Sequence, residues 1–167
     1  RITRSVQSIV EQLQLPDPWL TTTAAMLSQL GCVILPEIVL DKVYRGDKLD
    51  EKEIQLYKQH PFMGADLVAA IPRMKPVAEI IRLQDKPYGG PSASDDPHIG
   101  DGIPIGARIL KVALDFDALL SAGKSQTEAI AQLKGRKDQY DLKVLDSLIA
   151  TVSENAKFEV KPVGVAD

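Results

Sequence analysis

Residues 103–121 read IPIGARILKVALDFDALLS, and this stretch decides the fold class. Its apolar residues recur at helical spacing rather than in alternation. With about 100° of rotation per residue, one stripe of the helix holds Ile105, Ile109, Val112, Phe116 and Leu119. Such a stripe is the core-facing side of an amphipathic helix. The pattern predicts a long helix over about 104–121, with Leu114, Ala107 and Ala118 on a second apolar face.

The same helical spacing extends over most of the chain, and Pro, Gly and Asx residues stand between the apolar runs. Asp17-Pro18 is typical of a helix start, and Gly31 is expected to cap the end of that helix in a left-handed conformation. Asp50 and Ser125 each precede a glutamate by three residues, which predicts two capping boxes. We expect helices over about 2–13, 18–30, 36–40, 50–60, 62–71, 74–82, 125–133 and 141–153. The fold class is therefore all-α, with about seven to eight helices.

The length of 167 residues fits one domain, which we place at residues 1–154, with 155–167 as a C-terminal tail or linker. Hydrophobic residues make up 44% and charged residues 26%, which are ordinary globular values. With 20 basic against 23 acidic residues and no basic run, the sequence does not favour a nucleic-acid binder.

Targeting signals and the single cysteine contribute little to the assignment of a function. The single Cys32 lies in an apolar stretch and excludes an intrachain disulfide. No apolar run reaches the ~18 residues of a membrane span, and no signal peptide opens the sequence, so we expect a cytoplasmic protein without membrane contact. The sequence begins at Arg1 without methionine, which suggests a segment of a longer polypeptide.

Three motifs occur in a characteristic order. They are His60-Pro61-x-x-Gly64, then Val77 to Arg82 (VAEIIR), then the stretch that begins at Ile103. Tyr140-Asp141 follows ahead of the last predicted helix. Together they resemble the HD-GYP family, the helical HD-superfamily domains whose active members hydrolyse cyclic di-GMP. The resemblance covers about residues 5–150 and implies an HD-superfamily helical bundle.

The positions that bind metal in the family have lost their ligands here. Where the resemblance places the His-Asp pair, the chain has Ser28 and Gln29, and where it places two consecutive histidines the chain has Gln84 and Asp85. Metal-assisted phosphodiester hydrolysis needs clustered ions that acidify water, and these need charged or imidazole ligands. The sequence therefore indicates a degenerate domain with no resident metal or cofactor.

Further family positions have changed as well. Leu114 stands where the family has an aspartate ligand, and the GYP loop has become Tyr88-Gly89-Gly90-Pro91. Among the ligand positions that we can place, His60 alone keeps a histidine, and it precedes Pro61 at a helix start, where a structural role is available. The ligand of the first helix falls at or before Arg1. On this basis the old site is either filled by hydrophobic packing or has become a contact surface.

Three functions remain open. The first is a catalytically inactive regulatory or output domain of a bacterial response-regulator-type signalling protein, whose partner is another protein, an upstream sensory or receiver domain, or a second copy. The second is a non-hydrolysing sensor of cyclic di-GMP or another nucleotide, with Arg82 and Arg108 as candidate contacts, since arginine forks favour phosphate. The third is a residual metal-dependent phosphodiesterase around His60, Asp85 and Asp117.

Overall fold

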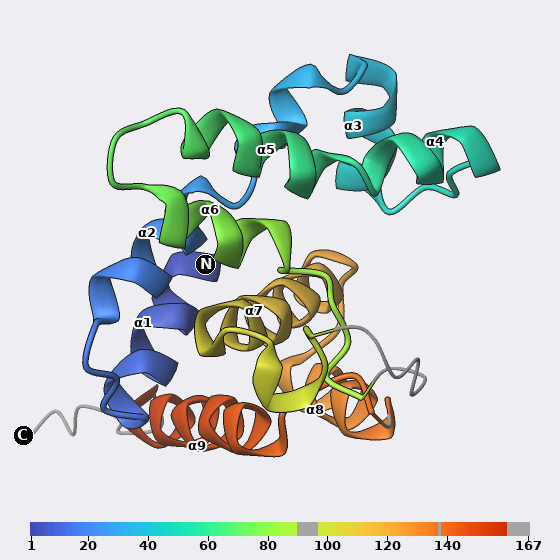
Figure 1. Ribbon diagram of the computed structural model, residues 1–167. Coiled ribbons are helices and arrows are strands. Elements are labelled where there is room, and N and C mark those ends of the chain that lie inside the picture. Colours follow the sequence, from blue (N-terminus) through green and yellow to red (C-terminus); the bar gives the residue numbers. More distant parts are fainter. Residues whose placement is uncertain (90–96, 137, 160–167) are drawn as a thin grey trace, which may run out of the picture.

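The computed structural model describes residues 1–89, 97–136 and 138–159, with no side-chain detail for 155–159. In this part of the chain every regular element is a helix, which confirms the all-α class (Figure 1). In chain order the elements are α1 (Ile2–Gln12), α2 (Pro18–Leu27), the 3₁₀ helix η1 (Leu30–Ile34), α3 (Glu37–Arg45), α4 (Glu51–Tyr57), α5 (His60–Ala69), α6 (Lys75–Arg82), the 3₁₀ helix η2 (Gly100–Gly102), α7 (Ile105–Ser121), α8 (Gln126–Gly135) and α9 (Leu142–Glu159).

Helix α7 forms the centre of the fold. It packs against α1, α2, α6, α8 and α9, as its long apolar stripe predicts. Within the stripe, Ile109, Val112 and Phe116 are buried, whereas Ile105 and Leu119 are half-buried at its two ends. Ala107 on the second face is also buried. The burial of both faces near the start of α7 explains why this segment of the sequence carries so few polar residues.

Local capping signals are confirmed at two helix starts. The Asp50 side chain accepts a hydrogen bond from the Glu53 backbone N–H, and the Glu53 carboxylate accepts one from the Asp50 backbone N–H. Ser125 and Glu128 form the same reciprocal pair at α8. A capping box satisfies two N–H groups that the helix itself cannot pair, so it fixes where a helix begins.

The predicted role of Gly31 is wrong. Helix α2 ends at Leu27, and Gly31 lies inside η1 without a positive φ angle. A β-carbon on Gly31 would come within 1.8 Å of the His60 carbonyl oxygen, so glycine is needed there because η1 and α5 touch backbone to backbone. Two further helices are longer than predicted, since α3 continues to Arg45 and α9 to Glu159. The predicted tail beyond residue 159 lies outside the described residues.

Helices α3 and α4 lie beside the end of α5 and away from α7 (Figure 1). An ion pair of 2.6 Å between Lys42 Nζ and Glu53 Oε1 joins them. In the described part of the chain, none of the helices has the length and apolar character to cross a membrane.

Candidate functional site

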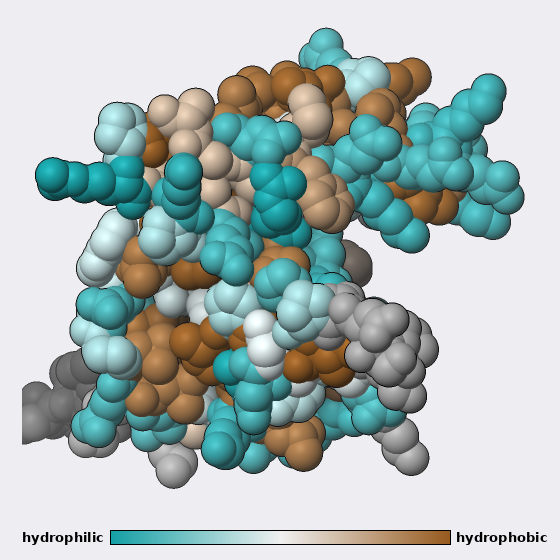
Figure 2. All heavy atoms as spheres, in the orientation of Figure 1, coloured by the Kyte–Doolittle hydropathy of each residue, from teal (hydrophilic) through white to brown (hydrophobic). Residues whose placement is uncertain are grey.

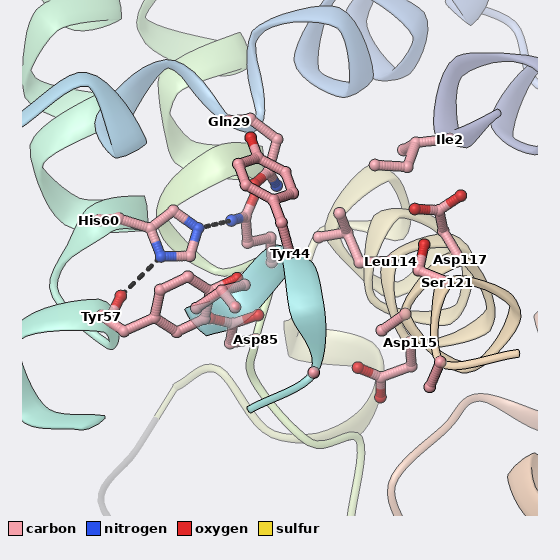
Figure 3. A pocket seen from close by; sticks show the side chains of 15 residues that line it. Ile2, Gln29, Tyr44, Tyr57, His60, Asp85, Leu114, Asp115, Asp117 and Ser121 are labelled. Carbon is pink, nitrogen blue, oxygen red and sulfur yellow. Dashed lines mark hydrogen bonds between the residues drawn. The ribbon is translucent and has the colours of Figure 1, made fainter. Parts of the chain in front are cut away.

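A cavity of about 420 Å³ opens between α3, the α4–α5 junction, the end of α6 and α7 (Figure 3). Five of the positions that the resemblance assigns to metal ligands line it, namely Gln29, His60, Gln84, Asp85 and Leu114. They come from segments up to 85 residues apart in the chain and meet because η1, α5, α6 and α7 pack together. The expectation that hydrophobic packing has filled the old site is therefore wrong, because an open pocket remains.

His60 is the first residue of α5 and is 2% exposed. Its Nδ1 lies 2.6 Å from the carbonyl oxygen of Tyr57, the last residue of α4. A carbonyl oxygen only accepts hydrogen bonds, so Nδ1 carries the proton and Nε2 has the lone pair. The amide nitrogen of Gln84 lies 3.3 Å from Nε2 and donates to it (Figure 3). Both ring nitrogens of His60 thus have protein partners.

Gln84 is completely buried, and its amide is only partly satisfied. The amide nitrogen also lies 3.4 Å from the backbone carbonyl oxygen of Ser28. The Oε1 atom has no hydrogen-bond partner among the described residues. A flipped amide would place Oε1 against the lone pair of His60, so the tautomer of the imidazole fixes the orientation that leaves Oε1 unpaired. The hydroxyl of Ser28 donates to the Ala25 carbonyl of its own helix, at 3.0 Å.

These residues do not fit the metal cluster that the family resemblance implies. The Nε2 atom of His60 is occupied by an amide, and Leu114 contributes only hydrocarbon where a carboxylate would balance a metal charge. In the described ranges, His, Cys, Asp and Glu form no group of three or more that could hold a metal ion. Cys32, which donates to the Gln29 side-chain oxygen at 3.4 Å, has its thiol pKa raised by burial and is no thiolate ligand.

The pocket wall nevertheless carries three carboxylates. Asp115 Oδ2 lies 2.8 Å from Lys111 Nζ and accepts a 2.7 Å hydrogen bond from the hydroxyl of Tyr140, and Asp117 Oδ1 lies 2.7 Å from Arg1 Nε. The contact with Arg1 makes Asp117 an ion-paired residue of α7. Asp85 differs, because no hydrogen bond or ion pair to its side chain occurs among the described residues.

The environment of Asp85 disfavours its charge. Its side chain is open to the pocket, yet burial among the surrounding protein atoms raises the pKa of the carboxyl above the ordinary value, against the opposing effect of His60 and Lys111. The proton is therefore held to higher pH than on a free aspartate.

Sequence reasoning missed two aromatic residues of the wall, Tyr44 and Tyr57. Burial, followed by the nearby Cys32, Asp85 and Tyr44, raises the pKa of Tyr57 to about 12, so its hydroxyl is neutral at physiological pH. Its ring lies 4.6 Å from the imidazole of His60, centroid to centroid. The sequence signal for Tyr57 is its position three residues before His60, across the turn between two helices. Tyr44 lies on α3 and is 76% exposed, and it belongs to none of the motifs that the sequence offers.

Arg82 lies outside the pocket. Its guanidinium binds Asp66 on α5 and lies 5.9 Å from the ring centroid of Phe62. The side chain therefore braces α6 against α5. The structure does not bring it together with the residues around His60.

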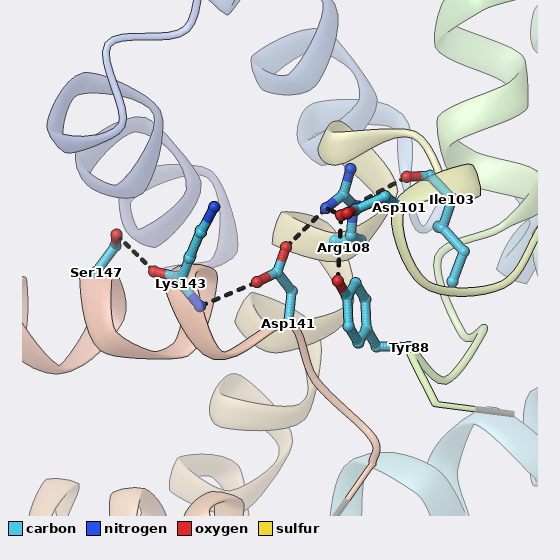
Figure 4. A network of polar contacts seen from close by, with 7 residues as sticks. All are labelled: Tyr88, Asp101, Ile103, Arg108, Asp141, Lys143 and Ser147. Atoms are coloured by element: carbon cyan, nitrogen blue, oxygen red, sulfur yellow. Dashed lines mark hydrogen bonds and ion pairs between the residues drawn. The ribbon is translucent and has the colours of Figure 1, made fainter.

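Arg108 is the centre of a separate polar network (Figure 4). Its guanidinium donates to Asp101 at 2.8 Å, to Asp141 at 2.7 Å and to the Ile103 carbonyl oxygen at 2.9 Å, and it lies 5.8 Å from the ring centroid of Tyr88. These contacts join the segment before α7 to the start of α9. Arg108 is thus engaged within the fold and does not line the cavity, and Gly90 and Pro91 of the altered GYP loop lie outside the described residues.

Comparisons with known proteins agree with this geometry. The HD-domain family matches residues 1–144. The cyclic di-GMP phosphodiesterase response regulator RpfG of Xanthomonas campestris pv. campestris is 33% identical in an alignment of 133 residues that covers 75% of this chain and 34% of RpfG. The solved structure of Bd1817, a HDG"Y"P protein from Bdellovibrio bacteriovorus, has the same fold with a TM-score of 0.70 and 20% identity, over 91% of this chain and 50% of that one.

The chain thus spans about a third of the length of RpfG and half of Bd1817. The HD match covers the motifs around His60, α6 and α7, and the fold likeness extends over almost all of the helices. The resemblance seen in the sequence is therefore confirmed, and the chain belongs to the HD-domain family, with HD-GYP proteins among its relatives.

Proposed function

We propose that this chain is a catalytically inactive HD-GYP-like domain that regulates a bacterial signalling protein of the response-regulator type through protein contacts. One observation carries the proposal: the amide of Gln84 donates to Nε2 of His60, at the place where a ligand histidine would offer its lone pair to a metal. An amide N–H cannot coordinate a cation, and it keeps the imidazole occupied.

The surrounding wall supports the loss of catalysis. Phosphodiester hydrolysis at neutral pH requires an activated water and positive charge on the phosphoryl oxygens. Leu114 contributes neither, and the described residues that line the cavity include acids but no lysine or arginine. A dianionic cyclic dinucleotide would meet Asp85, which has no basic partner among the described residues, while the basic groups next to Asp115 and Asp117 are already engaged with those carboxylates. The same argument disfavours the nucleotide-sensor hypothesis, because Arg82 and Arg108 are engaged elsewhere.

Exposed apolar side chains support a role in protein contact. They lie on η1, α3, α5 and the turn that follows α5, in the upper part of the molecule, where Figure 2 shows hydrophobic atoms at the surface. They comprise Val33, Ile34, Ile38, Phe62, Met63, Leu67 and Ile71, each at least 42% exposed. Apolar residues that gather on a surface are typical of an interaction site. The partner in this proposal is another protein or an upstream sensory or receiver domain.

A hydrolysis assay tests the catalytic part. The purified chain is incubated with cyclic di-GMP and manganese or iron(II), and the nucleotide is separated by chromatography, next to His60→Ala. We expect intact nucleotide in both samples. Turnover by the wild type that disappears in His60→Ala would replace the proposal by the residual phosphodiesterase, and calorimetric binding without turnover would replace it by the nucleotide sensor.

The contact part needs a different measurement. Ile38→Ser changes a side chain that is 65% exposed, so it should leave the thermal unfolding temperature unchanged. Introduced into the native gene, it should reduce the signalling output of the bacterium while cellular cyclic di-GMP stays constant. Gln132→Ser on the exposed side of α8 is the matched control and should leave output unchanged. Equal signalling output from both variants would contradict the proposal that this surface contacts the partner.

A further inference from the structure

Two consecutive residues of the pocket wall have acceptors that lack donors among the described residues. Asp85 has a carboxylate without a hydrogen bond or ion pair among the described residues, although Asp115 and Asp117 in the same wall each have a basic partner. Gln84 is fully buried, lines the same cavity and has an unpaired Oε1 atom. A buried acceptor without a partner, as at Gln84, is rare in native proteins and costly when it stays unpaired, whereas the exposed Asp85 carboxylate is accessible to a ligand.

Charge in the cavity has one sign. The lining residues of the described chain include three aspartates and no lysine or arginine, and the cations nearest to Asp115 and Asp117 are engaged with them. Both ring nitrogens of His60 already have partners within the protein, since Nδ1 donates to a carbonyl and Nε2 accepts from an amide. A wall that is rich in acceptors and negative in sign repels phosphate and attracts a cation that can donate hydrogen bonds.

Two aromatic residues complete this wall. Tyr44, Tyr57 and Asp85 all line the cavity, and Figure 3 shows the three side chains around the same hollow. Aromatic faces attract guanidinium and ammonium groups through the ring quadrupole. With about 420 Å³ of space, the cavity has room for such a group together with an alkyl chain against Leu114.

We propose that this pocket binds a cationic N–H donor, a guanidinium or alkylammonium group, with Asp85 as its counter-charge. The positive group binds the Asp85 carboxylate, its alkyl part lies along Leu114, and the rings of Tyr44 and Tyr57 border it. The group belongs either to a small free amine or guanidine or to an arginine or lysine side chain. This inference does not depend on the signalling role proposed above, which the hydrolysis assay tests separately.

Two probes of similar shape separate the effect of charge on binding from the effect of size. Butylguanidinium carries the proposed group, and butylurea has similar shape and N–H donors but no charge. Each is titrated into the ¹⁵N-labelled chain at low salt, and amide shifts of residues that line the cavity are followed. We expect saturable binding of butylguanidinium with shifts around Asp85 and at least about tenfold weaker binding of butylurea, a ratio that corresponds to about 1.4 kcal/mol.

Variants locate the counter-charge. Asp85→Asn keeps the size of the side chain and removes its charge. It should weaken the binding of butylguanidinium at least about tenfold, because the cation loses its ionic partner in a partly enclosed site. Asp146→Asn, an exposed acid on α9 away from the cavity, is the matched control and should bind as the wild type does. Unfolding temperatures of both variants verify that each is folded.

Two further titrations identify the source of the cation and test whether the site binds a metal ion instead. A Gly-Arg-Gly peptide with blocked termini that binds more tightly than butylguanidinium supports a protein side chain, and weaker binding supports a free small molecule. The proposal is overturned if butylguanidinium fails to bind, if butylurea binds equally well, or if Asp85→Asn has no effect. Manganese that binds through Asp85 while butylguanidinium does not would also overturn it.

Discussion

A single methyl group at Gly31 tests whether the contact between η1 and α5 holds the pocket in place. A β-carbon built on Gly31 lies 1.8 Å from the carbonyl oxygen of His60 and 2.8 Å from the backbone nitrogen of Gly64. Both atoms belong to the backbone of α5, so no side-chain rotation makes room. Because the φ angle of Gly31 is not positive, the effect of Gly31→Ala is steric rather than conformational.

The size of the effect follows from this distance. Real β-carbons essentially never approach closer than 3.0 Å, so η1 and α5 must separate by more than an ångström. Overpacking of a well-packed interior costs about 1–3 kcal/mol and occasionally more. Since backbone atoms must move here, we expect Gly31→Ala to lower the free energy of unfolding by about 3 kcal/mol. The displacement also takes His60 away from the Gln84 amide, 3.3 Å from its Nε2.

Urea unfolding followed by circular dichroism measures the free energy, and an NMR spectrum of the imidazole shows whether the His60 environment changes. Gly135→Ala is the matched control, because a β-carbon there meets nothing within 4 Å and the φ angle is not positive. The control should be neutral or stabilise the fold by up to about 1 kcal/mol, the usual gain of alanine over glycine in a helix. If Gly31→Ala unfolds at the same urea concentration as Gly135→Ala, the argument is refuted.

Three further predictions concern charged side chains. Arg108→Met leaves the nearly buried Asp141 carboxylate without its guanidinium, so urea unfolding should show a loss of about 3 kcal/mol, the low end for a broken buried pair, and unchanged stability would contradict it. Burial raises the pKa of Asp85, so folding favours its protonated form, and stability is lost as pH rises through the folded pKa. Asp85→Asn should remove that loss, and its free energy of unfolding should change less than that of the wild type between about pH 3 and 7. The hydrogen bond from Lys42, followed by that from the Asp50 backbone, lowers the pKa of Glu53, so these contacts stabilise the fold above the ordinary glutamate pKa and the effect disappears on acidification. Carbon-13 NMR of the carboxyl should show a higher pKa in Lys42→Met than in the wild type, because only the Asp50 contact remains.

Much of the fold could be predicted because it depends on local signals. The capping boxes at Asp50 and Ser125 are four-residue patterns, and the stripe of α7 is a property of a single helix. The end of α2 could not be predicted in this way. A glycine after an apolar run indicates a left-handed cap, but the reason for Gly31 lies in α5, some thirty residues later in the chain. A contact of that kind leaves no periodic pattern in the sequence.

The candidate site shows the same division. The family motifs placed Gln29, His60, Gln84, Asp85 and Leu114 in one site, and the structure brings these five together. The aromatic wall could not be found, because Tyr44 and Tyr57 belong to α3 and α4, and the position of these helices across the cavity from α7 depends on packing between segments far apart in the chain. Arg82 and Arg108 matched family positions in sequence, but nearby acids hold both of them away from the cavity.

The persistence of the pocket follows from what builds it. Its walls are set by the packing of η1, α5 and α7, which depends on small residues such as Gly31 and on apolar ones such as Phe116. None of these is a ligand, so the chemistry of the wall can change while its shape stays. A histidine that is 2% exposed still needs a partner at Nε2, and the Gln84 amide provides one without a metal. The cost is a Gln84 Oε1 atom without a partner among the described residues, and the next residue, Asp85, offers the carboxylate to which we assign a cation with N–H donors.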